Sequence, residues 1–283
     1  MLWSRAALPA AVVRSAPADA ARRHAVPASV VIGAASLATL LVVWEALSRA
    51  EIVSPFHFPA PSALLSALFD ISVRGFPEGV RIARHVAVTL QRIALGFVGA
   101  ALVGVPLGIL IGYVPILDKL THPIITFGRS VAAISLLPLF IAWFGIGELS
   151  KVMLIGLGTL WVVLTYTIAG VKYVDPILIR AARSMDVSVR DLFYRVILPA
   201  ALPRIFTGLR VALGVSFMII VAAEMIATVE GLGALIKEAR NAFRTDITMV
   251  GMLVIGSLGY AAGRLLELLE ARLLPWRAGV EAR

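Results

Sequence analysis

Long apolar stretches without charged residues alternate with short polar segments along this chain. A helix needs roughly 17–25 apolar residues to cross the hydrocarbon core of a bilayer, so each stretch of that length predicts a membrane span. Four stretches contain no Asp, Glu, Lys or Arg, and two later ones either carry charges or are close to the minimum length. The six predicted spans are 25–44, 93–117, 130–147, 152–171, 205–229 and 247–263. The pattern predicts an all-α, polytopic membrane protein with about six transmembrane helices.

The spans define a transmembrane domain over 25–276, flanked by an N-terminal tail (1–24) and a C-terminal tail (277–283). Two polar connections hold further helical patterns. The first predicts a short apolar helix that begins near Pro61, since proline suits the first helical turn. The second has helical apolar spacing over 234–243. We expect both helices to lie along the outer interface of the membrane.

The most informative polar segment runs over 175–199 and is rich in arginine. Asp175 followed by Pro176 predicts a helix start, because Asp caps helix N-termini and proline loses nothing at the first helical position. This helix is expected to end near Met185. Asp186 follows at a break, and Asp is one of the few residues besides glycine that enters the left-handed region at modest cost.

A second helix is predicted after Ser188, which has the spacing of a capping box with Asp191. It is expected to cover 192–198 and to end at Pro199. Apolar residues share one face of each helix: Ile177, Ala181, Ala182 and Met185 on the first, and Leu192, Val196 and Pro199 on the second. Such faces require a partner, and the spacing alone allows either the transmembrane bundle or another subunit.

The net charge of +9 follows from arginines beside the spans rather than from a basic stripe interleaved with aromatic residues. We therefore expect membrane lipid, and not nucleic acid, around this protein. Four arginines precede the first span, and the positive-inside rule places the N-terminus in the cytoplasm. Six crossings bring the C-terminus to the same side. The same count places the segment 175–199 in the cytoplasm.

Charged residues inside spans are costly and point to function or to a partner within the bundle. Arg92, Arg129 and Arg210 lie near predicted span ends, which favours snorkelling toward the interface. Glu224 lies deeper, and we expect it to form a structural ion pair or a gate-side hydrogen bond. A seam of small residues predicts close helix packing at Gly96, Gly99, Gly104, Gly108 and Gly112.

The segment 175–199 resembles the cytoplasmic EAA loop of ABC-importer permeases, through which the membrane subunit docks on its ATPase. The family pattern is Glu-Ala-Ala, three residues, Gly, nine residues, Ile, one residue and Leu-Pro. This chain keeps that register but replaces Glu with Arg, Gly with Asp and Ile with Val. The coupling residues that the resemblance implies are Arg180, Ala181, Ala182, Asp186, Val196, Leu198 and Pro199. The Arg180 replacement reverses a charge expected to face the ATPase.

The resemblance extends over roughly 55–276, through stretches such as SLLPLFIAWFGIGELSKV and LPAALPRIFTGLRVALG. These are similar to the nitrate/sulfonate/taurine branch of the family. Membership implies a permease bundle in the cell inner membrane, a homodimer, a separate ABC ATPase, and a periplasmic or lipid-anchored solute-binding protein. The solute implied is a small organic or inorganic anion.

The chemistry of the chain agrees with a transport role and not with an enzyme. None of the four lysines lies in a G-x-x-x-x-G-K-[ST] phosphate loop, so energy must come from elsewhere. Cysteine is absent, which removes thiolate metal sites and thiol catalysis. We expect no catalytic residue, metal or cofactor in this subunit, with ATP used by the separate ATPase. Two alternatives stay open: a related permease for another solute, such as a pyrimidine vitamin precursor, and a self-contained secondary transporter.

Overall fold

The structure, a computed structural model, describes residues 28–275 except 53, 55 and 78, and these residues contain helices and no strand. Both predicted tails, 1–24 and 277–283, lie outside the described residues. The elements in chain order are α1 (Ala28–Arg49), α2 (Pro61–Val73), α3 (Ile82–Tyr113), α4 (Pro115–Ser130), η1 (Ala133–Leu136), α5 (Leu137–Phe144), α6 (Glu148–Lys172), α7 (Pro176–Ser184), α8 (Val189–Asp191), η2 (Leu192–Ile197), α9 (Leu198–Ala227), α10 (Leu232–Asn241) and α11 (Thr245–Leu273). The predicted all-α class is confirmed.

The centre of the bundle is formed by α3, α6 and α9, which make the most extensive helix contacts. Glycines on α3 allow α6 to approach closely. A Cβ added at Gly96 would lie 2.7 Å from Ile155, and one at Gly108 would lie 2.6 Å from Thr167. The predicted small-residue seam is therefore real at these positions, since small residues let membrane helices pack backbone to backbone. Gly99 is the exception, because it faces open space.

Each predicted span falls on a helix or a helix pair. By length and apolar composition, four helices of the described residues can cross a membrane, α3, α6, α8–α9 and α11, and a bent pair raises the number to five. The first predicted span falls on α1, which is 22 residues long and not all of whose side chains are described. The prediction of about six spans is therefore approximate.

The predicted span 130–147 is not a single straight helix. The chain instead bends by 84° between α4 and the η1–α5 helix. Because α5 is only eight residues long and an α-helix rises 1.5 Å per residue, α5 alone is too short to cross a bilayer. By length, this region can span only together with α4, which carries Asp118, Lys119 and Arg129; the bent pair is then one broken span, and otherwise a re-entrant loop. The predicted span therefore covers one helix of a bent pair.

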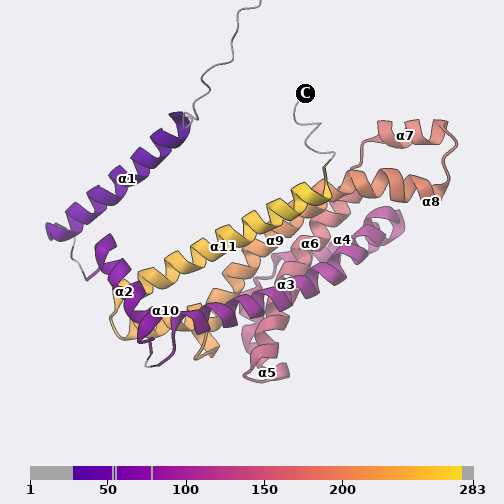
Figure 1. The fold of residues 1–283 in the computed structure, drawn as a ribbon. Coiled ribbons are helices and arrows are strands. Elements are labelled where there is room, and N and C mark those ends of the chain that lie inside the picture. Colours follow the sequence, from indigo (N-terminus) through magenta and orange to yellow (C-terminus); the bar gives the residue numbers. More distant parts are fainter. Residues whose placement is uncertain (1–27, 53, 55, 78, 276–283) are drawn as a thin grey trace, which may run out of the picture.

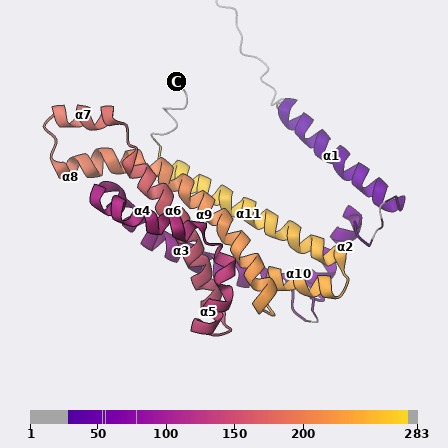
Figure 2. The same ribbon diagram turned by 180° about the vertical axis from the view of Figure 1, so that it is seen from behind.

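The bundle is elongated, and different short helices lie at its two ends (Figure 1). At one end, α7 and α8 project beyond the C-terminal end of α11; we call this the α7 end. At the other, α10 and α2 lie together, and we call this the α10 end. The view from behind shows the same separation (Figure 2). The sequence predicted that 175–199 and the α10 connection lie on opposite sides, and the fold agrees.

The predicted helices near Pro61 and over 234–243 both form, as α2 and α10. They pack with α11 in one apolar cluster that includes Leu64, Leu235 and Ile247. In both views α1 lies apart from the bundle and meets it through α2 (Figures 1 and 2). The α10 end therefore has its own small core in addition to the main one.

Candidate ATPase-coupling site and the polar network at the opposite end

The coupling segment, defined as residues 175–199, begins with a helix cap. The Asp175 carboxylate accepts a hydrogen bond from the Ile177 backbone N–H at 2.8 Å, and Pro176 occupies the first helical position. The first orphan amides of α7 are thereby satisfied or removed. The helix ends at Ser184 with Met185 as its C-cap. The predicted first helix of the segment is confirmed.

The turn after α7 also follows the prediction. Asp186 has a φ of 53°, in the left-handed region. The Ser188 hydroxyl then accepts a hydrogen bond from the Asp191 backbone N–H at 3.1 Å and donates to the Asp191 carboxylate at 2.8 Å. This reciprocal contact starts α8. Local side-chain chemistry therefore sets both the corner and the second helix start.

The predicted end of the second helix at Pro199 is wrong. The chain runs from α8 through a π-helical turn (η2) directly into α9, so that Val189–Ile226 forms one long helix. Proline breaks an α-helix because it lacks an N–H and its ring meets the preceding turn. In η2 the Leu198 N–H reaches back to the Phe193 carbonyl, and Pro199 then falls in the first turn of α9. The wider turn lets the helix continue past the proline.

The predicted apolar face of α7 is only partly packed. Ala182 is buried, and Ile179 packs with it against a cluster that includes Leu192 and Ala201. Ile177 and Met185 were assigned to the same face but are 62% and 78% exposed. The bundle thus covers one stripe of α7 and leaves its other apolar side chains largely exposed.

The seven predicted coupling residues do not form one contiguous surface. Three are exposed (Arg180, Ala181 and Asp186), three are half-buried (Val196, Leu198 and Pro199), and Ala182 is buried. Arg180 makes no ion pair with another described residue. The sequence pattern missed further exposed apolar side chains around it: Leu178, Val189 and Tyr194. The sequence could have indicated these three residues, because apolar side chains within an arginine-rich loop often mark a contact surface.

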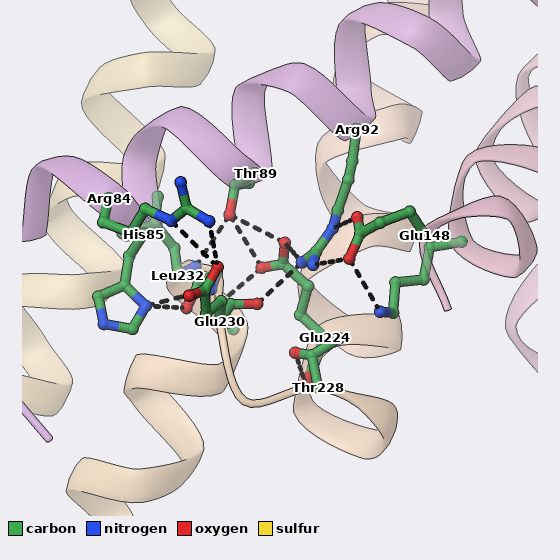
Figure 3. Close-up of polar contacts among 12 residues, drawn as sticks. Arg84, His85, Thr89, Arg92, Glu148, Glu224, Thr228, Glu230 and Leu232 are labelled. Carbon is green, nitrogen blue, oxygen red and sulfur yellow. Dashed lines mark hydrogen bonds and ion pairs between the residues drawn. The ribbon is translucent and has the colours of Figure 1, made fainter. Parts of the chain in front are cut away.

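A network of polar side chains lies toward the α10 end of the bundle (Figure 3). Arg92 on α3 donates from Nη1 to the Glu224 carboxylate on α9 at 2.7 Å and from Nη2 to Glu148 on α6 at 2.6 Å. Arg92 and Glu224 are buried, whereas the Glu148 side chain is 64% exposed. One guanidinium therefore ties together the three central helices.

The same network holds the loop before α10. Thr89 donates to Glu224 at 2.9 Å, and its oxygen accepts the Leu232 backbone N–H at 2.9 Å. Glu224 also accepts the Gly233 N–H at 2.9 Å. His85 contacts the backbone of Phe76 and Gly231, as Figure 3 shows in part. Every member is satisfied within the network, which gives it a structural role.

These contacts correct two sequence interpretations and confirm one. Arg92 and Arg210 were expected to snorkel, but Arg92 is buried in ion pairs and Arg210 pairs with Glu270 and Glu267 on α11. The expected ion pair of Glu224 is present. Spacing could not reveal the Arg92–Glu224 pair because its members are 132 residues apart. In the described part of the chain, no group of three or more His, Cys, Asp or Glu side chains could hold a metal.

Comparison with known proteins identifies the family to which this architecture belongs. The family model described as "Binding-protein-dependent transport system inner membrane component" matches residues 104–275. The chain is 39% identical over 253 residues to the taurine transport system permease protein TauC of Escherichia coli, an alignment that covers 89% of this chain and 92% of TauC. It is 32% identical to the putative aliphatic sulfonates transport permease protein SsuC of Bacillus subtilis, covering 86% of this chain and 87% of the relative.

Two further similarities extend this finding. The nitrate import permease protein NrtB of Synechocystis is 30% identical, with 86% of this chain and 88% of NrtB covered. Among solved structures, an inward-facing form of the MetNI methionine ABC transporter aligns with a TM-score of 0.59 at 19% identity, covering 69% of this chain and 94% of that chain. That likeness supports the fold alone. The chain belongs to the binding-protein-dependent transport system inner membrane components, the permease subunits of ABC importers, which are not enzymes themselves and work with a separate ATPase and a solute-binding protein.

Proposed function

We propose that this permease forms the membrane pathway for a small anion of the aliphatic sulfonate, taurine or nitrate type. The observation that carries the proposal is the 39% identity to a taurine permease over nearly the whole of both chains. Relatives named for aliphatic sulfonates and for nitrate support the same solute class. The solute arrives on a periplasmic or lipid-anchored binding protein at the α10 end.

The coupling segment is the docking site for the ATPase. Its exposed apolar residues support this role, because Ile177 and Met185 are 62% and 78% exposed. Exposed apolar groups rimmed by polar residues are typical of protein interaction sites. The caps at Asp175 and Ser188 keep the segment helical, so that it can transmit a rigid-body movement of the ATPase to α9 through the continuous α8–η2–α9 helix.

The proposed assembly contains two copies of this permease and two ATPases in the cell inner membrane. Both termini and the α7 end face the cytoplasm. The arginines that precede the first span support this orientation through the positive-inside rule. The tails, 1–24 and 277–283, flank the transmembrane domain on that side.

Reconstitution tests the proposal. The permease, its cognate ATPase and the binding protein are co-purified and placed in liposomes, and uptake of radiolabelled taurine, methanesulfonate and nitrate is measured with ATP. We expect ATP-dependent uptake of at least one of these anions, and no ATP hydrolysis by the permease alone. Uptake of a pyrimidine with no anion uptake would contradict the proposed solute class. Solute uptake by the permease alone, driven by an ion gradient, would contradict the ATPase partnership.

A further inference from the structure

A cavity of about 200 Å³ lies between α4 and α6, in the half of the bundle nearer the α7 end. One face of each helix lines it. From α4 come Asp118, Thr126 and Arg129, and from α6 come Thr165 and Lys172. The volume lies below the range typical of sites for drug-sized ligands, so the cavity suits a smaller molecule. Its lining combines cations, hydroxyls and apolar groups.

The charge of this cavity is positive. Lys172 is paired with Asp118, with 2.5 Å between Nζ and Oδ2, so these two charges offset each other. Arg129 makes no ion pair or hydrogen bond with another described side chain, and it is exposed. Next to the cavity, the Arg204 guanidinium lies 5.6 Å from the ring centre of the lining residue Tyr173. Arg129 therefore leaves the cavity with an uncompensated cation.

The depth of Arg129 makes that cation unusual. The preceding residue, Gly128, lies against the Trp161 ring, so that an added Cβ would come within 2.5 Å of it. Trp161 is near the middle of α6. Arg129 thus lies at mid-bundle, in the last turn of α4 beside the 84° bend and level with the middle of α6. Charged residues at this depth are rare and mark substrate or ion pathways by default.

A structural explanation of Arg129 accounts for only part of this. A cation in the last turn of a helix is stabilised by the helix dipole. A snorkelling arginine would be expected near the end of a span, whereas Arg129 lies level with the middle of α6. Neither effect explains why the side chain lines a cavity with Thr126, whose hydroxyl donates to no described residue. A guanidinium and a free hydroxyl are the donors that a small oxyanion requires.

We infer that this cavity binds the oxyanion group of the transported solute in transit, with Arg129 as its main donor and Thr126 as a second. The inference rests on the proposed function for the solute class, and it adds where the anion is held on its way to the cytoplasm. The broken α4–α5 span provides the mid-membrane position, as interrupted helices do in other transporters.

Thiol labelling tests the charge of the cavity directly. The chain contains no cysteine, so Thr126→Cys introduces a single thiol in the lining. Purified protein is treated with an anionic reagent (sulfonatoethyl methanethiosulfonate) or a cationic one (trimethylammonioethyl methanethiosulfonate). We expect Arg129→Gln to lower the ratio of anionic to cationic labelling rates by about tenfold, because an unscreened charge a few ångströms away acts oppositely on the two reagents.

Two variants control this experiment. Arg190→Gln removes the same charge from an exposed site on α8 and is expected to leave the labelling ratio unchanged. Arg129→Lys keeps the charge and is expected to retain most of the ratio. Elution on size-exclusion chromatography verifies that each variant is folded. Methanesulfonate and nitrate, at constant ionic strength, are expected to slow labelling of the introduced thiol only when Arg129 is present.

The outcomes separate this inference from the proposed function. An unchanged labelling ratio in Arg129→Gln, with anion uptake intact in the reconstituted complex, would overturn the inference and leave the function standing. Charge-selective labelling with no anion uptake by the wild-type complex would support the oxyanion site and overturn the function. Protection by phosphatidylglycerol but not by free methanesulfonate would identify a lipid headgroup as the occupant and overturn the inference.

Discussion

The polar network at the α10 end and the coupling segment at the α7 end differ in the burial and pairing of their charged side chains. Arg92 and Glu224 are buried and paired with each other, and the Gly233 backbone amide and the Thr89 hydroxyl donate to the remaining carboxylate oxygen. Arg180 on α7 is exposed and makes no ion pair with a described residue. The apolar residues differ in the same way, because Leu232 and Leu235 on α10 are buried whereas Ile177 on α7 and its C-cap Met185 are exposed.

This difference shows which end is complete within one chain. A buried ion pair with all its hydrogen bonds made keeps its surroundings in one arrangement, since losing either partner leaves an uncompensated charge. Within the coupling segment, α7 has only a thin apolar attachment to the bundle, through Ile179 and Ala182. Its remaining surface is available to a second protein. Substitutions at the α10 end should therefore affect folding, and substitutions at the α7 end should affect assembly.

The largest expected effect follows Glu224→Ala. The change leaves Arg92 without its buried partner and removes the acceptor of Thr89 and Gly233. We expect a loss of about 3–5 kcal/mol in stability, the usual result of breaking a buried pair. The loss of stability is measured by heating the detergent-solubilised protein and following the decrease of its monodisperse peak on size-exclusion chromatography. Glu267→Ala, at a partly exposed carboxylate on α11, is the matched control with a much smaller shift. Equal shifts for both variants would show that burial of the network is not what stabilises this end.

Substitutions at two adjacent alanines of α7 separate packing from docking. Ala182 is buried against the bundle and Ala181 is exposed. We expect Ala182→Leu to lower stability by roughly 1–3 kcal/mol through overpacking. Ala181→Leu should leave thermal stability unchanged but reduce the ATPase recovered in co-purification. If Ala181→Leu binds the ATPase as well as the parent does, this face of α7 is not part of the interface.

A smaller effect is expected from the cap of α7. Asp175→Ala removes the acceptor of the Ile177 N–H, at a typical cost of about 0.5–2 kcal/mol. Because α7 has few other attachments, the loss should appear as faster hydrogen exchange in 176–184 rather than as global unfolding. Asp175→Asn keeps an acceptor and should exchange like the parent. Unchanged exchange in Asp175→Ala would mean that packing of Ile179 and Ala182 alone maintains this helix.

The smallest effect on stability is expected from Arg180→Glu, because the side chain is exposed and unpaired among the described residues. Assembly should nevertheless weaken with the native ATPase, although the change restores the residue of the family pattern. An arginine at a docking surface needs an acid or a polar cleft opposite, and a glutamate there would meet like charge. Co-purification and uptake measure the effect. Assembly and transport equal to the parent would show that Arg180 is a solvated residue outside the interface.

Local chemistry explains why much of the coupling segment was predictable. The cap at Asp175, the left-handed Asp186 and the Ser188–Asp191 contact each involve residues at most three positions apart. The same locality failed at Pro199, where the helix-breaking rule holds for an α-helix but not for the π turn that precedes α9. Packing of α9 in the bundle favours the continuous helix over the break.

The amino-acid sequence by itself determined the helical class, most of the spans, the helix caps of the coupling segment and the glycine seam, because each depends on composition or on spacing within a few turns. Only the tertiary structure decided which charges are buried. It joined Arg92 to Glu224 across 132 residues, placed an 84° bend at the start of the third predicted span, and brought Arg129 to mid-bundle beside a cavity. The physical reason is that the cost of a charge depends on what surrounds it, and in a helical bundle those surroundings come from distant parts of the chain.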